Sequence, residues 1–434
     1  MSKSVLECHV FKQPSYLFLG FIIFFSFFSS MRLIHKLPIP YGTYIEVCIL
    51  FISCLYIFCS YFVGLFWKCR EQSLELYELY ILSLIFLVPL YTALRAYDTF
   101  GQPLIYGLLT QRSFMLAGYA LIIFTGIKHG YFKADLLESI LVKSAWLWML
   151  FCAFLQIFIN ADSLVNPSPF FIGGESSQEG VYFRYDPVLF IFGFIYYLYK
   201  GYLKDNKYYM ALSLPFLFFI VFLIEKRSLI LSLVIAIIFL SYLLFDRKTF
   251  LKIFSKSVLF VLILGSLLFV LFPVGSEDYI SRFIDAFSVV LSGEPGANPS
   301  ANARISELRL IWPYLESNWL IGNGGLSNHW NDGYRGTLGY FYPSDIGFFG
   351  SLFVFGFFIT LMIYLQYFFV CPGKVSLHSI SNNLLSITCY GVLTVIFFQS
   401  FIRSQLLFDV STTLFFVSVI YGLRKHSELS HVKD

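Results

Sequence analysis

The stretch IGFFGSLFVFGFFITLMIYLQYFFV, residues 346–370, carries no charged side chain and decides the class of fold. A second uncharged stretch runs from Ser257 to Val274. A helix needs about 20 mostly apolar residues to cross the hydrocarbon core of a bilayer, and both stretches approach or exceed that length. We therefore expect both stretches to form membrane-spanning helices.

The composition of the whole chain indicates the same class. Of its 434 residues, 58% are hydrophobic and 13% are charged, whereas a soluble domain is about 45–50% apolar and about 25% charged. A soluble protein of this size cannot bury so much apolar surface. The composition therefore excludes soluble enzymes, nucleic-acid-binding proteins, disordered chains and secreted disulfide scaffolds.

Twelve segments have the length and hydropathy of spanning helices. They lie at residues 15–31, 42–67, 74–94, 105–127, 141–159, 187–203, 208–224, 229–245, 257–274, 344–370, 384–401 and 405–423. The predicted fold is an all-α polytopic membrane protein of about 12 transmembrane helices. Residues 1–274 hold helices 1–9, and residues 344–434 hold helices 10–12 and a tail.

Two connections between these helices are long and polar, residues 160–186 and residues 275–343. The second contains Glu277–Leu291, whose apolar side chains recur at helical spacing and predict an amphipathic helix lying on the bilayer surface. A second short helix is expected from about Asn302 to Ser317. The apolar face expected for that helix consists of Ile305, Leu308, Trp312 and Leu315.

The glycine-rich run Gly322–Gly325 then predicts a turn. Residues 275–343 are therefore expected to form a folded cap over the membrane helices, between helices 9 and 10.

The distribution of lysine and arginine predicts the orientation of the chain. With the N-terminus inside, 18 of the 30 basic residues fall in short inner loops. Both termini are then cytoplasmic and both long loops lie outside. The basic N-terminus resembles a signal peptide, but no small-residue cleavage site follows, so we expect a retained first helix.

The two sides differ in the type of basic residue. Fifteen of the inner basic residues are lysine, whereas ten of the twelve outer ones are arginine. The outer arginines are Arg32, Arg95, Arg112, Arg184, Arg227, Arg282, Arg304, Arg309, Arg335 and Arg403. Arginine suits planar, bidentate contact with phosphate or carboxylate. The alternative is that these arginines form structural ion pairs with Glu225, Glu277, Asp285 and Glu307.

An anion-binding site on the outer face of the membrane argues against chemistry driven by ATP, because ATP is absent on that side. The chain has no phosphate-binding GxxxxGK[ST] loop and no HExxH, CxxC or GxSxG motif, so we expect no nucleotide, metal or other cofactor. The phosphorylated molecules that are anchored at the outer face of the membrane are lipid-linked sugars. Several arginines are able to neutralise a pyrophosphate without a metal ion.

Four local motifs carry a resemblance to a known family. Val181-Tyr-Phe-Arg-Tyr-Asp-Pro187 precedes a helix, and Glu225-Lys-Arg-Ser-Leu229 forms a tight outer turn. Ala303–Trp312 is followed by Asn318-Trp-Leu-Ile-Gly-Asn-Gly-Gly325, and Tyr342-Pro-Ser-Asp-Ile-Gly-Phe-Phe-Gly350 opens the helix after the cap. In order, spacing and side of the membrane, these motifs resemble the Wzy-type O-antigen polymerases of the O-antigen polymerase and ligase superfamily.

The resemblance implies a fold related to the GT-C glycosyltransferases and a place in the bacterial inner membrane. It implies transfer of a glycan from an undecaprenyl-pyrophosphate-linked donor to a lipid-linked repeat unit at the periplasmic face. The partners would be those lipid-linked oligosaccharides, membrane lipid and a chain-length regulator protein, with no nucleic acid. Ser344-Asp345 stands where the ligases carry a His-Asn-like pair, which favours a polymerase and leaves a ligase as an alternative.

The site residues follow from the arginine distribution and the motifs. Arg184, Arg227, Arg304 and Arg309 are the candidates for binding the pyrophosphate and glycan. Arg304 and Arg309 point about 140° apart on an ideal helix, so they need not face one phosphate.

Asp345 is the candidate general base, because the attacking hydroxyl has to lose its proton. Two structural alternatives remain open. Arg304 and Glu307 are spaced for an ordinary ion pair along one helix, and Asp345 is also placed to cap the following helix.

A lipid-linked oligosaccharide flippase or another transporter is the rival class. Such folds normally show related halves, which are not visible here. A flippase cavity should also carry charge deep in the membrane, whereas the charge in this chain gathers at the outer edge.

Overall fold

The structure of the chain is a computed structural model. It describes residues 75–111, 114, 117–158, 174–177, 180–183, 186–224, 227–245, 247–248, 250–251, 254–255, 299–370, 383–403 and 410–431. The first, second and ninth predicted spans and the predicted amphipathic helix Glu277–Leu291 lie outside the described residues.

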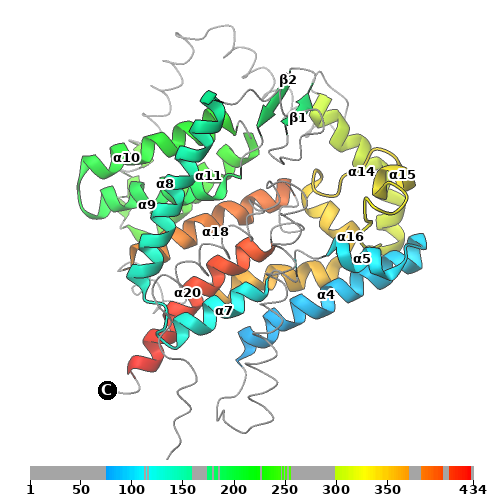
Figure 1. The fold of residues 1–434 in the computed structure, drawn as a ribbon, viewed down its shortest axis with the longest axis horizontal. Coiled ribbons are helices and arrows are strands. Elements are labelled where there is room, and N and C mark those ends of the chain that lie inside the picture. The colour runs from blue at the N-terminus through cyan, green and yellow to red at the C-terminus, as the bar shows by residue number, and fades with distance from the viewer. Residues whose placement is uncertain are drawn as a thin grey trace, which may run out of the picture.

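The described part of the chain is helical apart from one short hairpin (Figure 1). The helices are α4 (Leu76–Phe100), α5 (Leu104–Thr110), α7 (Gly118–Lys128), α8 (Ala134–Phe158), α9 (Val188–Leu203), α10 (Lys207–Phe218), the π-helix η4 (Phe219–Leu223), α11 (Arg227–Leu244), α14 (Pro299–Asn318), α15 (Gly333–Leu338), α16 (Gly347–Tyr364), the 3₁₀-helix η5 (Leu365–Val370), α18 (Leu384–Ile402) and α20 (Val410–His431). The strands β1 (Gly174–Ser177) and β2 (Gly180–Phe183) pair antiparallel inside the first predicted long loop.

Four helical segments are long and apolar enough to cross a membrane: α4, α8, Gly347–Val370 and α18. Four more apolar helices are shorter, at Gly118–Lys128, Val188–Leu203, Lys207–Phe222 and Ser228–Leu244. The class of helical membrane protein is therefore confirmed. The total of 12 spans and the relation to the GT-C fold stay predictions.

In Figure 1, α8 to α11 gather on one side of the molecule and α5, α14, α15 and α16 on the other, with α18 and α20 between them. Helix α9 packs on α10 and α18, α11 packs on α18, and α20 packs on α7. Aromatic rings fill these contacts. The ring of Tyr77, for example, lies 5.0 Å from those of Phe124 and Tyr421 and 4.9 Å from that of Phe369. This arrangement buries the apolar faces between helices, and the exposed faces of α4 and α8 keep their leucine and phenylalanine side chains.

The fourth predicted span, 105–127, is wrong as a single helix. The chain forms α5, turns at Gln111 and restarts as α7. Gln111 is a buried polar residue that packs against Gly325 of the cap. The helix predicted over residues 105–127 therefore ends at Gln111, whose polar side chain contacts the cap.

The tenth predicted span is interrupted at Gly356. This residue has φ 71° and ψ 176°, which is not helical. Two backbone carbonyls before Gly356 accept hydrogen bonds from the cap. Asn323 N donates to Phe353 O at 2.7 Å, and Gly324 N donates to Val354 O at 3.0 Å. Non-helical backbone is tolerated in such a segment where protein satisfies its polar groups.

The cap helix expected from about Asn302 to Ser317 is present as α14. Its buried face differs from the prediction. Glu307, Ile311 and Leu315 are buried, whereas Trp312 is 46% exposed and donates a hydrogen bond to Glu316 Oε1 at 2.6 Å. The indole is amphipathic, so it lies at the surface with its N–H satisfied.

Candidate functional site

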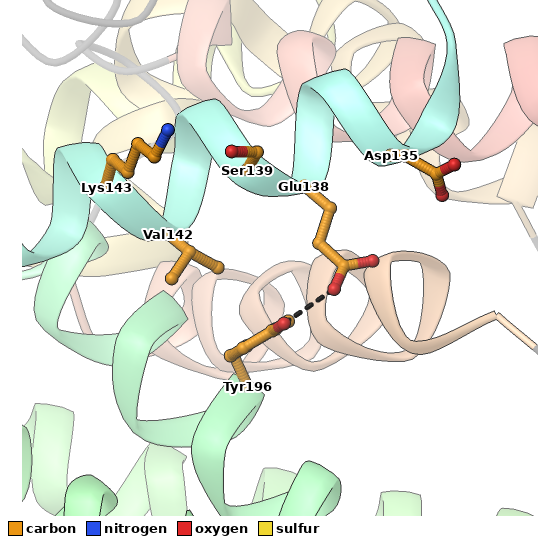
Figure 2. Close-up of a pocket in the computed structure, with 6 residues that line it drawn as sticks. All are labelled: Asp135, Glu138, Ser139, Val142, Lys143 and Tyr196. Atoms are coloured by element: carbon orange, nitrogen blue, oxygen red, sulfur yellow. Dashed lines mark hydrogen bonds between the residues drawn. The ribbon is translucent and has the colours of Figure 1, made fainter.

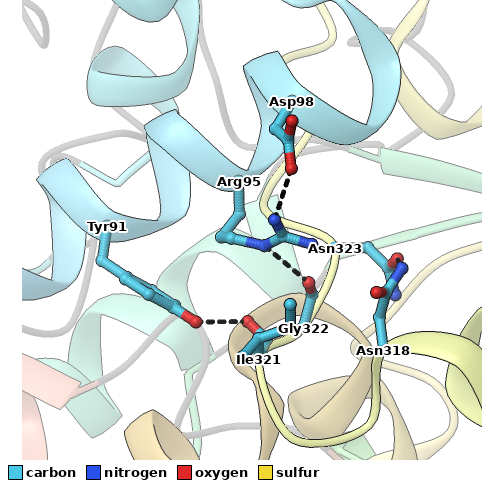
Figure 3. A network of polar contacts seen from close by, with 7 residues as sticks. All are labelled: Tyr91, Arg95, Asp98, Asn318, Ile321, Gly322 and Asn323. Carbon is cyan, nitrogen blue, oxygen red and sulfur yellow. Dashed lines mark hydrogen bonds and ion pairs between the residues drawn. The ribbon is translucent and has the colours of Figure 1, made fainter.

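The cap is attached to the bundle through the end of α4, as Figure 3 shows. Tyr91 donates its hydroxyl to Ile321 O at 2.6 Å, and Arg95 Nε donates to Gly322 O at 3.0 Å. Arg95 also pairs with Asp98. For this outer arginine the alternative role is therefore correct, because its guanidinium supports the cap backbone.

A buried glutamine completes this attachment. Gln102 donates from Nε2 to Gly325 O at 3.0 Å and accepts from Ser327 N at 2.7 Å. Gly324 has φ +87°, and a Cβ there would lie 2.2 Å from Ala96 N on α4. The turn predicted at Gly322–Gly325 lies earlier, at residues 319–321, and Gly322–Gly325 follow as an irregular loop. Glycine is required at position 324 because the loop lies directly against a helix backbone.

In the middle of α14, the long helix of the cap, lies a carboxylate in an unusual setting. Glu307 is 2% exposed, and its carboxylate accepts a hydrogen bond from the backbone N–H of Tyr342. The Oε2 atom is buried and has no hydrogen-bond partner within the described part of the chain. Buried polar atoms are almost always bonded, so an unpartnered one asks for an explanation.

Glu307 also differs from the other buried charged residues that the structure describes, Glu78 and Lys128. Glu78 Oε2 accepts from Glu75 N at 3.0 Å, and Lys128 pairs with Glu75 at 2.8 Å. Glu75, Glu78 and Lys128 thus bond to one another at the N-terminal end of α4. Glu307 has no such ion-pair partner within 4 Å among the residues described.

Two of the predicted site residues act electrostatically on Glu307. The pKa of the Glu307 carboxyl is raised from 4.5 to about 7. Burial raises it most, the negative charge of Asp345 also raises it, and the Tyr342 N–H and the positive charge of Arg304 lower it. Arg304 and Glu307 do not form the ordinary ion pair that their spacing allows. The site therefore combines one buried carboxylate, one half-buried carboxylate and one guanidinium.

Asp345 does not cap α16. The residue before that helix is Ile346, and no side chain caps the first turn. Asp345 is half-buried, its backbone N–H donates to Tyr342 O at 2.9 Å, and its Oδ1 faces the hydroxyl of Ser344 at 3.4 Å. The N-cap alternative is therefore wrong, and the negative charge of Asp345 acts on Glu307.

Tyr340 forms the exposed rim of this cluster. Desolvation of its hydroxyl, followed by the negative charges of Glu307 and Asp345, raises the pKa of Tyr340, and the charge of Arg335 lowers it. The ring itself is 65% exposed. We name Arg304, Glu307, Tyr340 and Asp345 the carboxylate cluster.

The other predicted site residues are not brought to the carboxylate cluster by the described structure. Arg309 lies on the exposed side of α14, as the angle between the two arginines predicts. Arg227 begins α11, but its side chain lies outside the described part, and Arg184 lies outside the described residues altogether.

Sequence reasoning treated Glu307 only as an ion-pair partner for arginine. The signal that identifies it is its spacing from Ile311 and Leu315, which places it on the same buried face of α14. A charged residue in register with a buried apolar face indicates a special role, because burial of a charge is costly unless it is neutralised or paired.

A second polar cluster lies between α8 and α9 (Figure 2). It surrounds a cavity of about 280 Å³ lined by Asp135, Glu138, Ser139, Val142, Lys143 and Tyr196. Tyr196 donates to Glu138 Oε1 at 2.5 Å, and Lys200 donates to Tyr196 at 2.9 Å. These groups satisfy one another, so this cluster stabilises the contact between α8 and α9.

In the ranges that the structure describes, no group of three or more His, Cys, Asp or Glu side chains is arranged to hold a metal ion. No protein-family model, curated protein or solved structure matches the chain. The function is therefore inferred from the chemistry of the carboxylate cluster and from the sequence.

Proposed function

We propose that this protein is a polysaccharide polymerase of the O-antigen type. It transfers a glycan from an undecaprenyl-pyrophosphate-linked donor to a lipid-linked repeat-unit acceptor at the periplasmic face of the bacterial inner membrane. One observation carries the proposal. Arg304 and Asp345, selected from the sequence as an anion-binding group and a base, both act electrostatically on one buried carboxylate of the cap, Glu307 of α14.

The reaction assigns a separate task to each group. A hydroxyl oxygen of the acceptor attacks the anomeric carbon of the donor, and the bond from that carbon to the phosphate oxygen breaks. Asp345 accepts the hydroxyl proton, and undecaprenyl pyrophosphate leaves with the bonding electrons. Arg304 stabilises the charge that develops on the leaving group, with Arg227 and Arg184 as further candidates.

The position of the cluster suits a substrate that arrives from lipid. Tyr340, at its rim, is exposed, and so are Trp319, Leu320 and Ile321 at the turn that follows α14. Aromatic and apolar side chains of this kind hold a protein at the membrane interface. A lipid-linked sugar pyrophosphate would present its head group to the cluster from that interface, without nucleotide or metal.

The transporter alternative is less well supported by the described residues. Their buried charges lie toward the ends of the helices, at the start of α4, at the end of α7 and on the cap. Buried polar residues farther inside, including Thr360, Gln366 and Gln399, are neutral. A ligase remains the nearer alternative and would differ in its acceptor. A chain-length regulator is proposed as a partner on the family resemblance alone.

The proposal is tested with purified full-length protein and a synthetic lipid-pyrophosphate repeat unit, in EDTA and without nucleotide. We expect a ladder of products on a gel from the wild type. Arg304→Ala should abolish the ladder, whereas Arg424→Ala, which removes an exposed arginine from α20, should leave it unchanged. Transport of the same lipid into liposomes without any product would contradict the proposal.

A further inference from the structure

We propose that Glu307 takes up one proton when the pyrophosphate of the donor binds at Arg304. The inference rests on the proposed function for the identity of the anion. It assigns Glu307 a positioning role in the binding step and leaves the proton transfer of the reaction to Asp345.

The geometry around Glu307 favours a neutral carboxyl. Its side chain is enclosed, Oε2 has no partner among the described residues, and one backbone N–H, that of Tyr342, bonds the carboxylate. Ionisation would leave a buried charge with a single hydrogen bond. A protonated carboxyl removes that charge, and burial therefore disfavours the ionised form.

The charges that face Glu307 make the empty site sensitive to an anion. Asp345 and the hydroxyl of Tyr340 approach from the segment before α16, and Arg304 lies on α14 itself. Arg304 is the cation that acts on Glu307, and Arg335 acts on Tyr340. With both carboxylates ionised, Arg304 offsets the negative charges of Glu307 and Asp345 only in part.

A bound pyrophosphate changes this balance. Its charge engages Arg304 and adds further negative charge beside Glu307 and Asp345. Nearby like charge disfavours ionisation of a carboxyl. Glu307 is the buried member of the pair, so it takes the proton, while half-buried Asp345 keeps its charge and can act as the base.

A measurable consequence is a link between donor affinity and pH. Binding that consumes one proton weakens about tenfold for each pH unit above the pKa of the group that is protonated. The dissociation constant should therefore rise through neutral pH. Release of the product lipid should return the proton to solvent.

Isothermal titration calorimetry on the full-length protein in detergent tests the inference. The probe is a short-chain polyprenyl-pyrophosphate-linked monosaccharide, whose two diester phosphates keep their charge over the pH range used. Titration in two buffers of different ionisation enthalpy counts the protons taken up. We expect uptake approaching one proton above neutral pH and a dissociation constant that rises about tenfold per unit.

Glu307→Gln should abolish both the proton uptake and the pH dependence, and should bind the probe at high pH as tightly as the wild type does at low pH. Glu316→Gln, a change at an exposed position of the same helix, should behave as the wild type. A thermal melt of each variant establishes that it is folded.

The outcomes separate this inference from the proposed function. Proton-linked binding without a product ladder would retain the inference and contradict polymerisation. A product ladder together with probe binding that takes up no proton and does not depend on pH would overturn the inference alone. So would a dissociation constant that still rises with pH in Glu307→Gln. Absence of probe binding to the wild type would overturn both.

Discussion

At the scale of single residues, Glu307 accounts for most of the chemistry of the site. It is buried to 2% exposure with one oxygen unpartnered, and its pKa lies at about 7 because burial and Asp345 both oppose its ionisation. A carboxyl with such a pKa changes charge in the physiological range.

The first prediction concerns stability. The pKa of Glu307 is raised in the folded protein, from 4.5 to about 7. Its contribution to the free energy of unfolding is therefore fully present below about pH 4.5 and is lost as pH rises through 7. The free energy of unfolding should fall by roughly 3 kcal/mol as a result. Thermal melts of the wild type and Glu307→Gln in detergent should therefore diverge over this window, the variant being the more stable above neutral pH.

Glu316→Gln provides the matched control, since its carboxylate is exposed on the same helix. Its melting temperature should follow that of the wild type at every pH. Parallel curves for wild type and Glu307→Gln would show that Glu307 ionises normally in the folded protein.

The second prediction concerns Asp345. Asp345→Asn preserves the size of the side chain and removes the base, so the rate of polymerisation should fall by about 10²–10⁴-fold. Donor binding should be retained, because Arg304 is untouched. Initial rates from the product ladder measure the loss, with Asp332→Asn in the exposed part of the cap as the control. An unchanged rate in Asp345→Asn would remove it from the mechanism.

At the scale of elements, the cap loop and α16 form one unit. The loop from Trp319 to Gly324 bonds to the backbone on both sides of Gly356, and Phe357 N donates to Trp319 O at 2.9 Å. A Cβ on Gly322 would lie 2.4 Å from Gly356 N. The helix interruption and the loop therefore depend on each other.

The third prediction follows from this packing. Gly324→Ala places a Cβ against the backbone of α4 at a positive φ, and should destabilise the protein by about 2–4 kcal/mol. Gly339→Ala shares the positive φ but meets nothing within 4 Å, so it should cost only the backbone strain, about 1–3 kcal/mol, and less than Gly324→Ala. Melting temperatures of both variants in detergent test this; equal losses would contradict the close approach to α4.

Most helix positions followed from hydropathy, since the predicted spans 187–203, 208–224, 229–245 and 384–401 fall on α9 to α11 and α18. Hydropathy did not reveal the interruption at Gly356, because no change in polarity marks it. The reason for the interruption lies in a loop that is distant in the sequence. The same holds for Gln102 and Gln111, whose partners are cap residues.

The site was predictable in part. Arg304 and Asp345 followed from charge distribution and motif, and in the structure the charges of both act on Glu307; their roles in binding and catalysis stay predictions. The depth at which α14 buries Glu307 depends on tertiary packing, as does the exposure of Trp312. Neither is encoded in a local pattern strong enough to identify it.

At the scale of the whole molecule, basic residues of different type lie at the two ends of α4. The start of α4 meets Lys128, and its far end holds the cap. This helix has 25 residues, a length of about 37 Å. Arg304 and Arg335 belong to the cap helices α14 and α15, and Arg95 bonds to the cap loop, whereas Lys128 lies at the start of α4, in agreement with the segregation seen in the sequence.

The fourth prediction places these ends on opposite sides of the membrane. In a protein whose native cysteines are replaced, Asn331→Cys in the exposed cap should react with an impermeant maleimide added to intact spheroplasts. Asp205→Cys, in the exposed turn after α9, should react only after the membrane is opened. The reverse pattern would invert the predicted orientation and contradict a periplasmic site.

The most direct test of the central claim is an electron cryomicroscopy structure of the full-length protein in a lipid nanodisc with a lipid-pyrophosphate donor bound. We predict density for the pyrophosphate within hydrogen-bond distance of Arg304, with the sugar between it and Asp345. Pyrophosphate density in the cavity beside Glu138 and Tyr196, or at any place away from α14, would contradict the account.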